Sequence, residues 1–113
     1  MLSSKIYLDE ILRMIEKIEG SVLHKSFDDF LHDDNLLDAT LMRLHFIGEN
    51  IKNISFTLKK KYPHVKWRKL AKLRNIISHK YSMVNKEIIW DVITNTLPDL
   101  KKEIAHILNE EKF

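Results

Sequence analysis

The sequence predicts an all-α protein, an antiparallel bundle of four to five helices, and three observations support that fold class. Apolar residues recur at steps of three and four along most of the chain, which is the period of one helix face. The 113 residues include only 2 glycines and 2 prolines, too few turn formers for a β-sandwich or barrel. No segment shows the sustained two-residue alternation of a half-buried strand. With 44% hydrophobic and 31% charged residues, residues 1–113 are expected to form one domain around a single core.

A first helix is predicted from Ser4 to Val22. Its apolar face comprises Leu8, Ile11, Leu12, Ile15, Ile18 and Val22. Gly20 and the polar stretch 24–29 are expected to end this helix. Ser26 and Asp29 then have the spacing of a capping box, in which each side chain bonds the backbone N–H of the other residue, so a short helix is predicted there.

A second, longer helix is predicted to begin at Asp33–Asn35, which offer N-cap side chains and negative charge that favours a helix N-terminus. Its apolar seam comprises Leu37, Leu41, Leu44, Gly48, Ile51, Ser55 and Leu58. Because Gly48 and Ser55 are small, another helix is expected to approach closely at these two positions. Tyr62 and Pro63 end the pattern, since the residue before a proline avoids the helical region.

The remaining residues predict a third helix, a fourth helix, and either a fifth helix or a kinked extension of the fourth. The third helix is expected to bury Trp67, Leu70, Ala71, Leu73, Ile76 and Ile77. Asn85 is a candidate N-cap for the fourth, whose apolar residues are Ile88, Ile89, Val92 and Ile93. Thr96–Pro98 interrupt it. The apolar pattern continues with Leu100, Ile104, Ile107 and Leu108.

Positive charge is concentrated in one segment. Residues 59–80 contain nine Lys or Arg and no Asp or Glu, a net charge of +9, whereas the rest of the chain carries −6. A protein that needs charge only for solubility intersperses the two signs, so this separation indicates a polyanionic partner on one face. A solvated helix face is the alternative for the lysines considered alone.

Several classes of protein are excluded or disfavoured by composition. The chain has no cysteine, which excludes disulfide scaffolds, cysteine-ligated metals and a thiol nucleophile. No apolar run approaches the roughly 18 residues that span a bilayer. Seven charged residues are spread through the first 20 positions, where a signal peptide would have an apolar stretch. A cytoplasmic location without membrane partners is therefore expected.

The densest cluster of reactive side chains lies where the cationic segment meets the end of the third helix. It comprises Arg74, Asn75, Ser78, His79 and Tyr81. In an α-helix these positions fall on two adjacent faces and could line one groove. An arginine can stabilise charge on phosphorus, and a histidine can move a proton at neutral pH, so the two suffice for metal-free RNA cleavage. From spacing alone, a structural polar helix end remains the alternative.

Arg74, His79 and Tyr81 are spaced as Arg, four residues, His, one residue, Tyr. With this motif the chain resembles the HEPN-domain ribonuclease toxins of the HepT type over nearly its whole length. The other matching features are Phe30-Leu31 with Asp33, Ala39, Ile47-Gly48-Glu49, Tyr62-Pro63 before Trp67-Arg68, and Ile89-Trp90-Asp91 before Leu97-Pro98-Asp99-Leu100. Many relatives in that family carry Asp where Asn75 or Asn85 stands here, a mild change outside the three motif residues.

The resemblance implies a function and a role for each motif residue. It implies a metal-independent endoribonuclease without cofactor, the toxin of a toxin–antitoxin pair, with transfer RNA as the expected substrate and a homodimer as the active form. Arg74 would stabilise the scissile phosphate and His79 would act as general base or acid, supported by Asn75 and Ser78. The antitoxin would be a nucleotidyltransferase that adenylylates Tyr81. The side chains expected to hold the RNA backbone are Lys66, Arg68, Lys69, Lys72 and Lys80.

Two pairs of residues have the spacing of metal ligands. Glu103 with His106, and Asp29 with His32, show the i, i+3 spacing found in di-iron helix bundles. His32 belongs to a short acidic element that is not expected to face His106. Surface histidines are therefore the favoured interpretation, and no metal site is predicted.

Glu49 has two interpretations: it could line the cleft or pair with Arg74, or it could belong to a buried structural ion pair. Trp67 and Trp90 are expected to belong to the core, although tryptophans can also stack on bases. The residues favoured for RNA contact outside the motif are Tyr62, His64, Lys66 and Arg68.

Two other functions compete with a ribonuclease. One is a non-catalytic HEPN module that binds a nucleotidyltransferase, but intact Arg74 and His79 argue against it. The other is a DNA-binding protein that uses residues 67–78 as a reading helix, although the glycine-containing turn of a helix-turn-helix pair is absent.

Overall fold

The computed structural model describes residues 2–78 and 84–113, except for the side chains of residues 2 and 76–78. In chain order the elements are α1 (Leu2–Val22), α2 (Phe27–Leu31), α3 (Asp34–Asn53), α4 (Phe56–Lys61), α5 (Trp67–Ala71), the 3-10 helix η1 (Lys72–Ser78), α6 (Lys86–Asp91), the π-helix η3 (Val92–Thr96) and α7 (Leu97–Glu110). All regular structure in these described residues is helical, which confirms the predicted all-α class.

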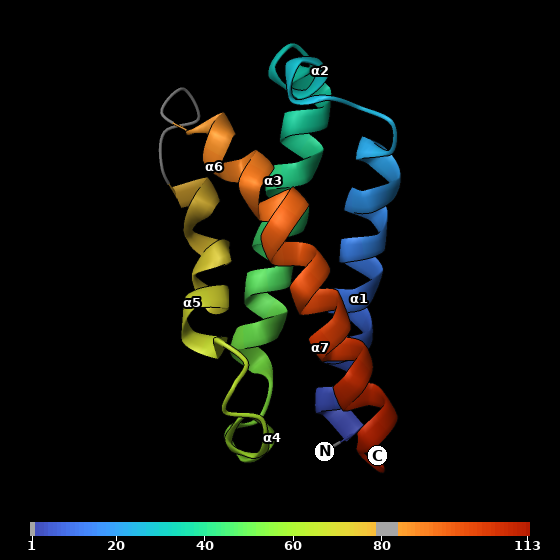
Figure 1. Cartoon of the computed structure of the whole chain (residues 1–113). Coiled ribbons are helices and arrows are strands. Elements are labelled where there is room, and N and C mark those ends of the chain that lie inside the picture. Colours follow the sequence, from blue (N-terminus) through green and yellow to red (C-terminus); the bar gives the residue numbers. More distant parts are fainter. Residues whose placement is uncertain (1, 79–83) are drawn as a thin grey trace.

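The helices form four antiparallel rods (Figure 1). The first is α1 and the second is α3, which runs in the opposite direction. The third consists of α5 and η1, and the fourth of α6, η3 and α7. The rod α3 lies against α1, α5 and η1, while α7 also packs on α1. The short helices α2 and α4 lie at opposite ends of the bundle, and this arrangement confirms the predicted antiparallel packing.

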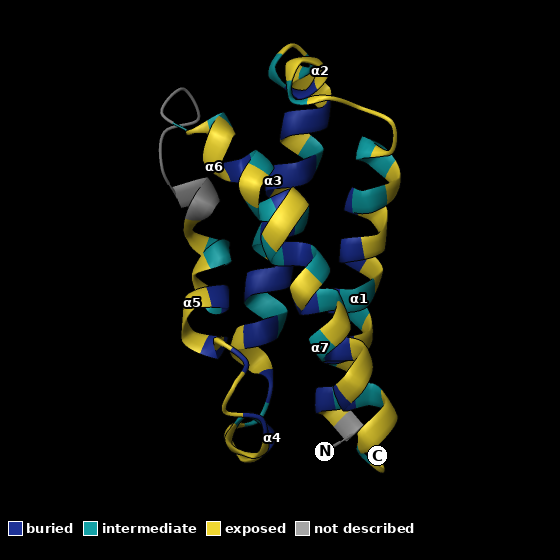
Figure 2. Cartoon of the chain, viewed as in Figure 1, coloured by how far each residue is buried: buried dark blue, intermediate teal, exposed yellow. Residues whose placement is uncertain are grey.

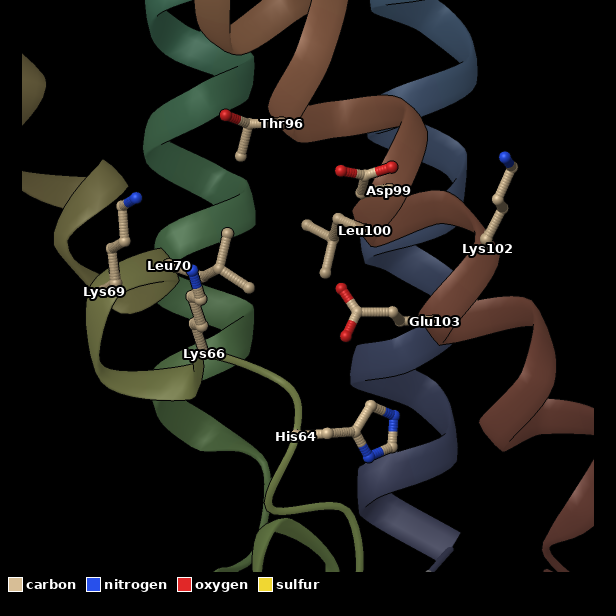
Figure 3. Close-up of a pocket in the computed structure, with 9 residues that line it drawn as sticks. All are labelled: His64, Lys66, Lys69, Leu70, Thr96, Asp99, Leu100, Lys102 and Glu103. Carbon is tan, nitrogen blue, oxygen red and sulfur yellow. The ribbon is translucent and has the colours of Figure 1, made fainter.

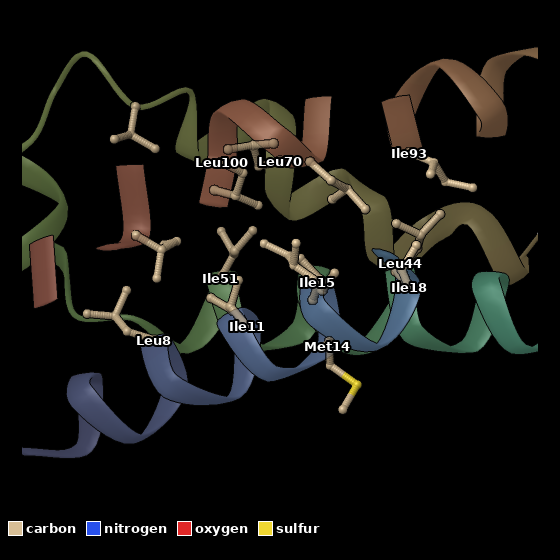
Figure 4. Close-up of a cluster of buried hydrophobic side chains, with 14 of the residues drawn as sticks. Leu8, Ile11, Met14, Ile15, Ile18, Leu44, Ile51, Leu70, Ile93 and Leu100 are labelled. Atoms are coloured by element: carbon tan, nitrogen blue, oxygen red, sulfur yellow. The ribbon is translucent and has the colours of Figure 1, made fainter. Parts of the chain in front are cut away.

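The core runs the length of the bundle between the rods (Figures 2 and 4). Its fully buried side chains include Leu8, Ile11, Ile15, Ile18, Leu44, Ile47, Ile51, Leu97, Ile104 and Ile107. Leu12 and Val22, which the helical period assigns to the inner face, are only partly buried at its edge. Trp67 is 8% exposed and belongs to the core, and Trp90 packs its ring 5.3 Å from that of Phe30, so both tryptophans are packing residues as predicted.

Three helix starts use the predicted capping side chains. In α2, the backbone N–H of Asp29 donates to Ser26 Oγ at 3.1 Å, and the N–H of Ser26 donates to Asp29 Oδ2 at 2.9 Å. Asp33 Oδ1 accepts from Leu36 N–H at 3.0 Å at the start of α3. Asn85 caps α6 in the same way. Each such cap is worth about 1 kcal/mol, because it satisfies an N–H group that has no partner within the helix.

The second long helix is shorter than its apolar seam predicts. It ends at Asn53, and Ser55 adopts an extended conformation (φ −61°, ψ 145°) as the N-cap of α4. The Ser55 backbone N–H donates to Ser4 Oγ at 3.2 Å, and its own hydroxyl accepts from Leu58 N–H. Ser55 thus starts a new element, and its bond with Ser4 of α1 confirms that a neighbouring helix approaches closely at this position.

The third helix changes its winding after Ala71. It is an α-helix only from Trp67 to Ala71 and continues as the 3-10 helix η1 to Ser78. The predicted alignment on two α-helical faces is therefore wrong for Arg74, Asn75 and Ser78, because a 3-10 helix advances by about 120° per residue. The carbonyl of Arg74 accepts a hydrogen bond from a side chain of α3, and this bond competes with the regular α-helical pattern.

The fourth rod is continuous, which confirms the kinked extension and not a separate fifth helix. The backbone N–H of Leu97 bonds the Val92 carbonyl, so the chain widens into a π turn just before Pro98. In a regular α-helix the proline ring would clash with the carbonyl four residues earlier, and the wider turn accommodates it. Among the described residues no helix is both long enough and apolar enough to cross a membrane.

Candidate functional site

Gly48 brings the backbone of η1 into direct contact with α3. A Cβ atom at this position would overlap the Arg74 backbone nitrogen and would lie 2.9 Å from Arg74 Cα and 3.0 Å from the Ala71 carbonyl oxygen. Any side chain other than hydrogen would force the two helices apart. The close approach predicted at this glycine is thus confirmed, and it fixes where Arg74 lies.

His45 provides a second link between the two elements. Its Nδ1 lies 2.7 Å from the Arg74 carbonyl oxygen, 29 residues away in sequence. A carbonyl can only accept, so Nδ1 carries the hydrogen and donates. Sequence reasoning did not identify His45, although it lies one turn before Gly48 and Glu49 on the same helix, and that spacing is the signal that could have found it.

The guanidinium of Arg74 pairs with Glu49, so three residues of α3, Gly48, His45 and Glu49, contact Arg74. Arg74 Nη1 lies 3.6 Å from Glu49 Oε1, and each side chain is 38% exposed. This exposure rules out the buried ion pair that was one interpretation of Glu49. A half-exposed pair of this kind is screened by water, so the arginine keeps donors available for a phosphate.

The other motif residues are only partly covered by the structure. Asn75 follows Arg74 on η1 and is exposed. Ser78 is the last residue of η1, but its side chain is outside the description. His79, Lys80 and Tyr81 lie outside the described residues. The predicted meeting of all five motif side chains therefore stays a prediction.

An exposed cationic surface adjoins Arg74 along α5 and the start of η1. Lys66, Arg68, Lys69 and Lys72 are all exposed, as expected for residues that bind a polyanion. Together with Val65 and Trp67 they surround a shallow hollow of about 460 Å³. Lys80, the fifth predicted RNA-binding residue, lies outside the described part of the chain.

Two further expectations concern residues near this surface. His64 is exposed, as RNA contact requires. Tyr62 is only 8% exposed, and its hydroxyl donates to Glu111 Oε2 at 2.7 Å. The prediction that Tyr62 contacts RNA is wrong, because the tyrosine joins the end of α4 to the residue after α7.

Within residues 2–78 and 84–113, no three His, Asp or Glu side chains converge in a way that could hold a metal ion. The Nδ1 atom of His32 lies 2.8 Å from the Asp28 carbonyl oxygen. The His106 ring packs edge-on to Tyr62, with ring centroids 6.3 Å apart. Both histidines thus have local structural contacts.

Fold and site together define a class of protein: a small antiparallel all-α bundle with a half-exposed arginine that follows a run of exposed cationic residues in the same rod. The chain belongs to the HepT-like ribonuclease family, since the family model described as "Ribonuclease HepT-like" matches residues 11–107. This match confirms the resemblance deduced from the motif.

Several curated proteins are similar to the chain. It is 36% identical over 112 residues to a protein of Caldanaerobacter subterraneus named "Putative RNase", and the match covers 99% of this chain and 100% of that protein. It is 35% identical over 99 residues to a Thermococcus cleftensis protein named "Probable ribonuclease HepT", covering 88% and 90%. A Methanocaldococcus jannaschii protein named "Gamma-glutamylcyclotransferase and putative RNase" is 41% identical over 106 residues, which are 94% of this chain but 48% of that protein. No solved structure matches.

Proposed function

We propose that the chain is a metal-independent endoribonuclease that cuts RNA with Arg74 and His79, and that it is the toxin of a toxin–antitoxin pair. The observation that carries the proposal is the fixed position of Arg74. Its backbone is held against Gly48 and His45, while its guanidinium stays half-exposed and follows the exposed cationic residues of α5 and the start of η1. Membership of the HepT-like ribonuclease family supports RNA as the substrate.

The proposed reaction uses the substrate's own 2′-hydroxyl as the nucleophile. His79 removes its proton, the 2′-oxygen forms a bond to phosphorus, and the bond from phosphorus to the 5′-oxygen breaks. The motif histidine of a second copy of the chain donates a proton to the leaving 5′-oxygen. The products are therefore a 2′,3′-cyclic phosphate and a 5′-hydroxyl. Arg74 stabilises the additional negative charge on the phosphate oxygens in the transition state.

Cleavage of transfer RNA in the presence of EDTA tests this mechanism. Arg74→Ala and His79→Ala should each lower the cleavage rate by about a hundredfold or more, because electrostatic stabilisation and proton transfer are each worth that much. Helical content, measured by circular dichroism, should stay close to wild type. The control is Lys5→Ala, since Lys5 forms an exposed ion pair with Asp9 at 2.7 Å on α1, and this variant should cleave normally.

Two results would contradict the proposal. Activity that disappears in EDTA and returns with magnesium would show that the reaction depends on a metal. Wild-type cleavage by either the Arg74 or the His79 variant would place the chemistry elsewhere in the molecule.

Regulation by a nucleotidyltransferase antitoxin is the second part of the proposal. The Tyr81 phenol oxygen would attack the α-phosphorus of ATP, lose its proton and release pyrophosphate. The product carries a bulky, negatively charged AMP group two residues from His79. This group would occupy the position of the scissile phosphate and repel RNA, so activity would be lost without refolding.

Intact-mass spectrometry after co-expression with such a nucleotidyltransferase tests this regulation. The wild type should gain the mass of AMP and lose cleavage, whereas Tyr81→Phe should keep its original mass. Tyr7→Phe is the matched control and should still be modified. An AMP increment that persists in Tyr81→Phe, or a modified protein that still cleaves RNA, would refute it.

A further inference from the structure

A cavity of about 470 Å³ lies between the start of α5 and the first turns of α7 (Figure 3). Lys66 and Lys69 lie on the α5 side, and the carboxylate of Glu103 extends toward that side from α7, which also carries Asp99 and Lys102. Leu70 and Leu100 lie between the two walls and are 6% and 1% exposed. The remaining lining residues are His64, Lys66, Lys69, Thr96 and Lys102.

The charged groups of the two walls are unpaired. Among the described residues, none of the lysines or carboxylates that line the cavity forms a salt bridge. The neighbouring Lys101, by contrast, pairs with Glu19 at 2.8 Å on the outside of the bundle. Burial raises the pKa of Glu103, an effect that the charges of His64 and Lys66 partly offset. Cationic donors and anionic acceptors therefore face an open space of the size that small ligands occupy.

We propose that this cavity binds one nucleotide whose base carries an exocyclic amino group. Lys66 and Lys69 would bind the phosphate, and the flat base would pack on the apolar floor at Leu70. The amino group would then donate to Asp99 or Glu103, as a carboxylate accepts from cytosine N4 in base recognition. Uracil presents a carbonyl oxygen at the same position, which the carboxylates would repel.

The nucleotide could belong to a bound RNA strand or be free in solution. Lys66 and Lys69 also border the hollow in the cationic surface, so a strand held there could turn one nucleotide into the cavity. Binding of a nucleotide that belongs to an RNA strand rests on the proposed ribonuclease function. Binding of a free mononucleotide does not, because the cavity does not include Arg74.

Titration with CMP and UMP tests the proposal, because the two bases differ in the group on C4, amino in cytosine and carbonyl in uracil, and in the adjoining N3, which is an acceptor in cytosine and a donor in uracil. The wild type should bind CMP about tenfold more tightly than UMP. Glu103→Gln or Asp99→Asn should reduce this preference, since an amide can donate to the uracil carbonyl as well as accept. Glu110→Gln, an exposed change farther along α7, should retain it.

Equal affinity for CMP and UMP, absence of binding at millimolar concentrations, or a full preference in both cavity variants would overturn the proposal. Whether the bound nucleotide belongs to an RNA strand or is free is tested in the Arg74→Ala variant, by adding a short cytidine oligonucleotide and measuring whether it displaces CMP. Competition with CMP supports a strand-borne nucleotide, and CMP binding without competition supports a free one. Absence of RNA cleavage by the wild type would refute the ribonuclease but leave the CMP preference intact.

Discussion

The two glycines of the chain stand in opposite environments, and this contrast gives a residue-scale test of the site. Gly48→Ala would place a methyl group against the Arg74 backbone, so we expect η1 to shift and the free energy of unfolding to fall by about 1–3 kcal/mol, with loss of RNA cleavage. A Cβ at Gly20 has nothing within 4 Å. Gly20→Ala should therefore raise stability by up to about 1 kcal/mol, because alanine favours a helix.

Urea denaturation followed by circular dichroism measures both effects on the same scale. Cleavage assays on the two variants then separate stability from function, since Gly20→Ala leaves the Arg74 region unchanged. Similar unfolding midpoints for the two variants would contradict the close approach between α3 and η1.

At the level of single residues, sequence reasoning identified the side chains proposed to take part in RNA cleavage, but it missed a side chain that holds the Arg74 backbone in place. Arg74 was recognisable because its charge suits a phosphate site, Gly48 because it interrupts an apolar seam, and Glu49 because it is next to that glycine. His45 is marked only by its position one turn before Gly48, and its hydrogen bond goes to a backbone carbonyl 29 residues away. Contacts to backbone atoms depend on how two elements dock, which residue types do not reveal.

At the scale of elements, local rules predicted helix starts well and the winding of η1 poorly. The caps at Ser26, Asp33 and Asn85 depend on neighbours within three residues, and all three are present. The 3-10 winding of Lys72–Ser78 instead accompanies the packing of this segment against α3. Tertiary contact thus overrides the helical period at the segment that carries the motif.

Another element-scale feature is a contact that joins α4 to the end of α7. The Tyr62 hydroxyl donates to Glu111, which also pairs with Lys61 at 3.1 Å. The hydrogen bond to the carboxylate raises the pKa of Tyr62 from 10.0 to about 12. The same hydrogen bond is the largest cause that lowers the pKa of Glu111 below its usual 4.5.

These two shifts define a pH window for the stability that the contact provides. The tyrosine pKa is raised on folding, so its contribution is complete below pH 10 and is lost as pH rises toward about 12. The glutamate pKa is lowered, so its contribution is complete above about pH 4.5 and is lost as pH falls through the folded value.

Tyr62→Phe should therefore destabilise the protein by roughly 1.5 kcal/mol near neutral pH, the usual worth of a hydrogen bond to a charged group. The difference from wild type should shrink below pH 4 and above pH 10. Urea titrations across this range measure it, with Tyr7→Phe as the control for loss of a hydroxyl elsewhere. A difference that does not change with pH would mean that the bond does not contribute to stability.

At the scale of the whole molecule, we propose that two copies associate through α3. One copy supplies a single motif histidine, yet bond formation and leaving-group departure each require a proton transfer. Met42 and Phe46 are apolar residues on α3, each 48% exposed, and they border a hollow of about 480 Å³ between α1 and α3. The Phe46 ring lies 6.1 Å from that of His45, so this apolar surface adjoins the Arg74 contact.

Phe46→Asp should convert the dimer to a monomer, because a charge in an apolar interface remains unpaired and desolvated. Sedimentation velocity over a range of concentrations measures the shift, and Phe46→Leu should remain dimeric because its side chain is still apolar. The matched control is Phe56→Asp: Phe56 is 76% exposed at the start of α4, where an acidic side chain is favourable. A wild type that sediments as a monomer while it cleaves RNA at full rate, or a Phe46→Asp variant that stays dimeric, would contradict association through this surface.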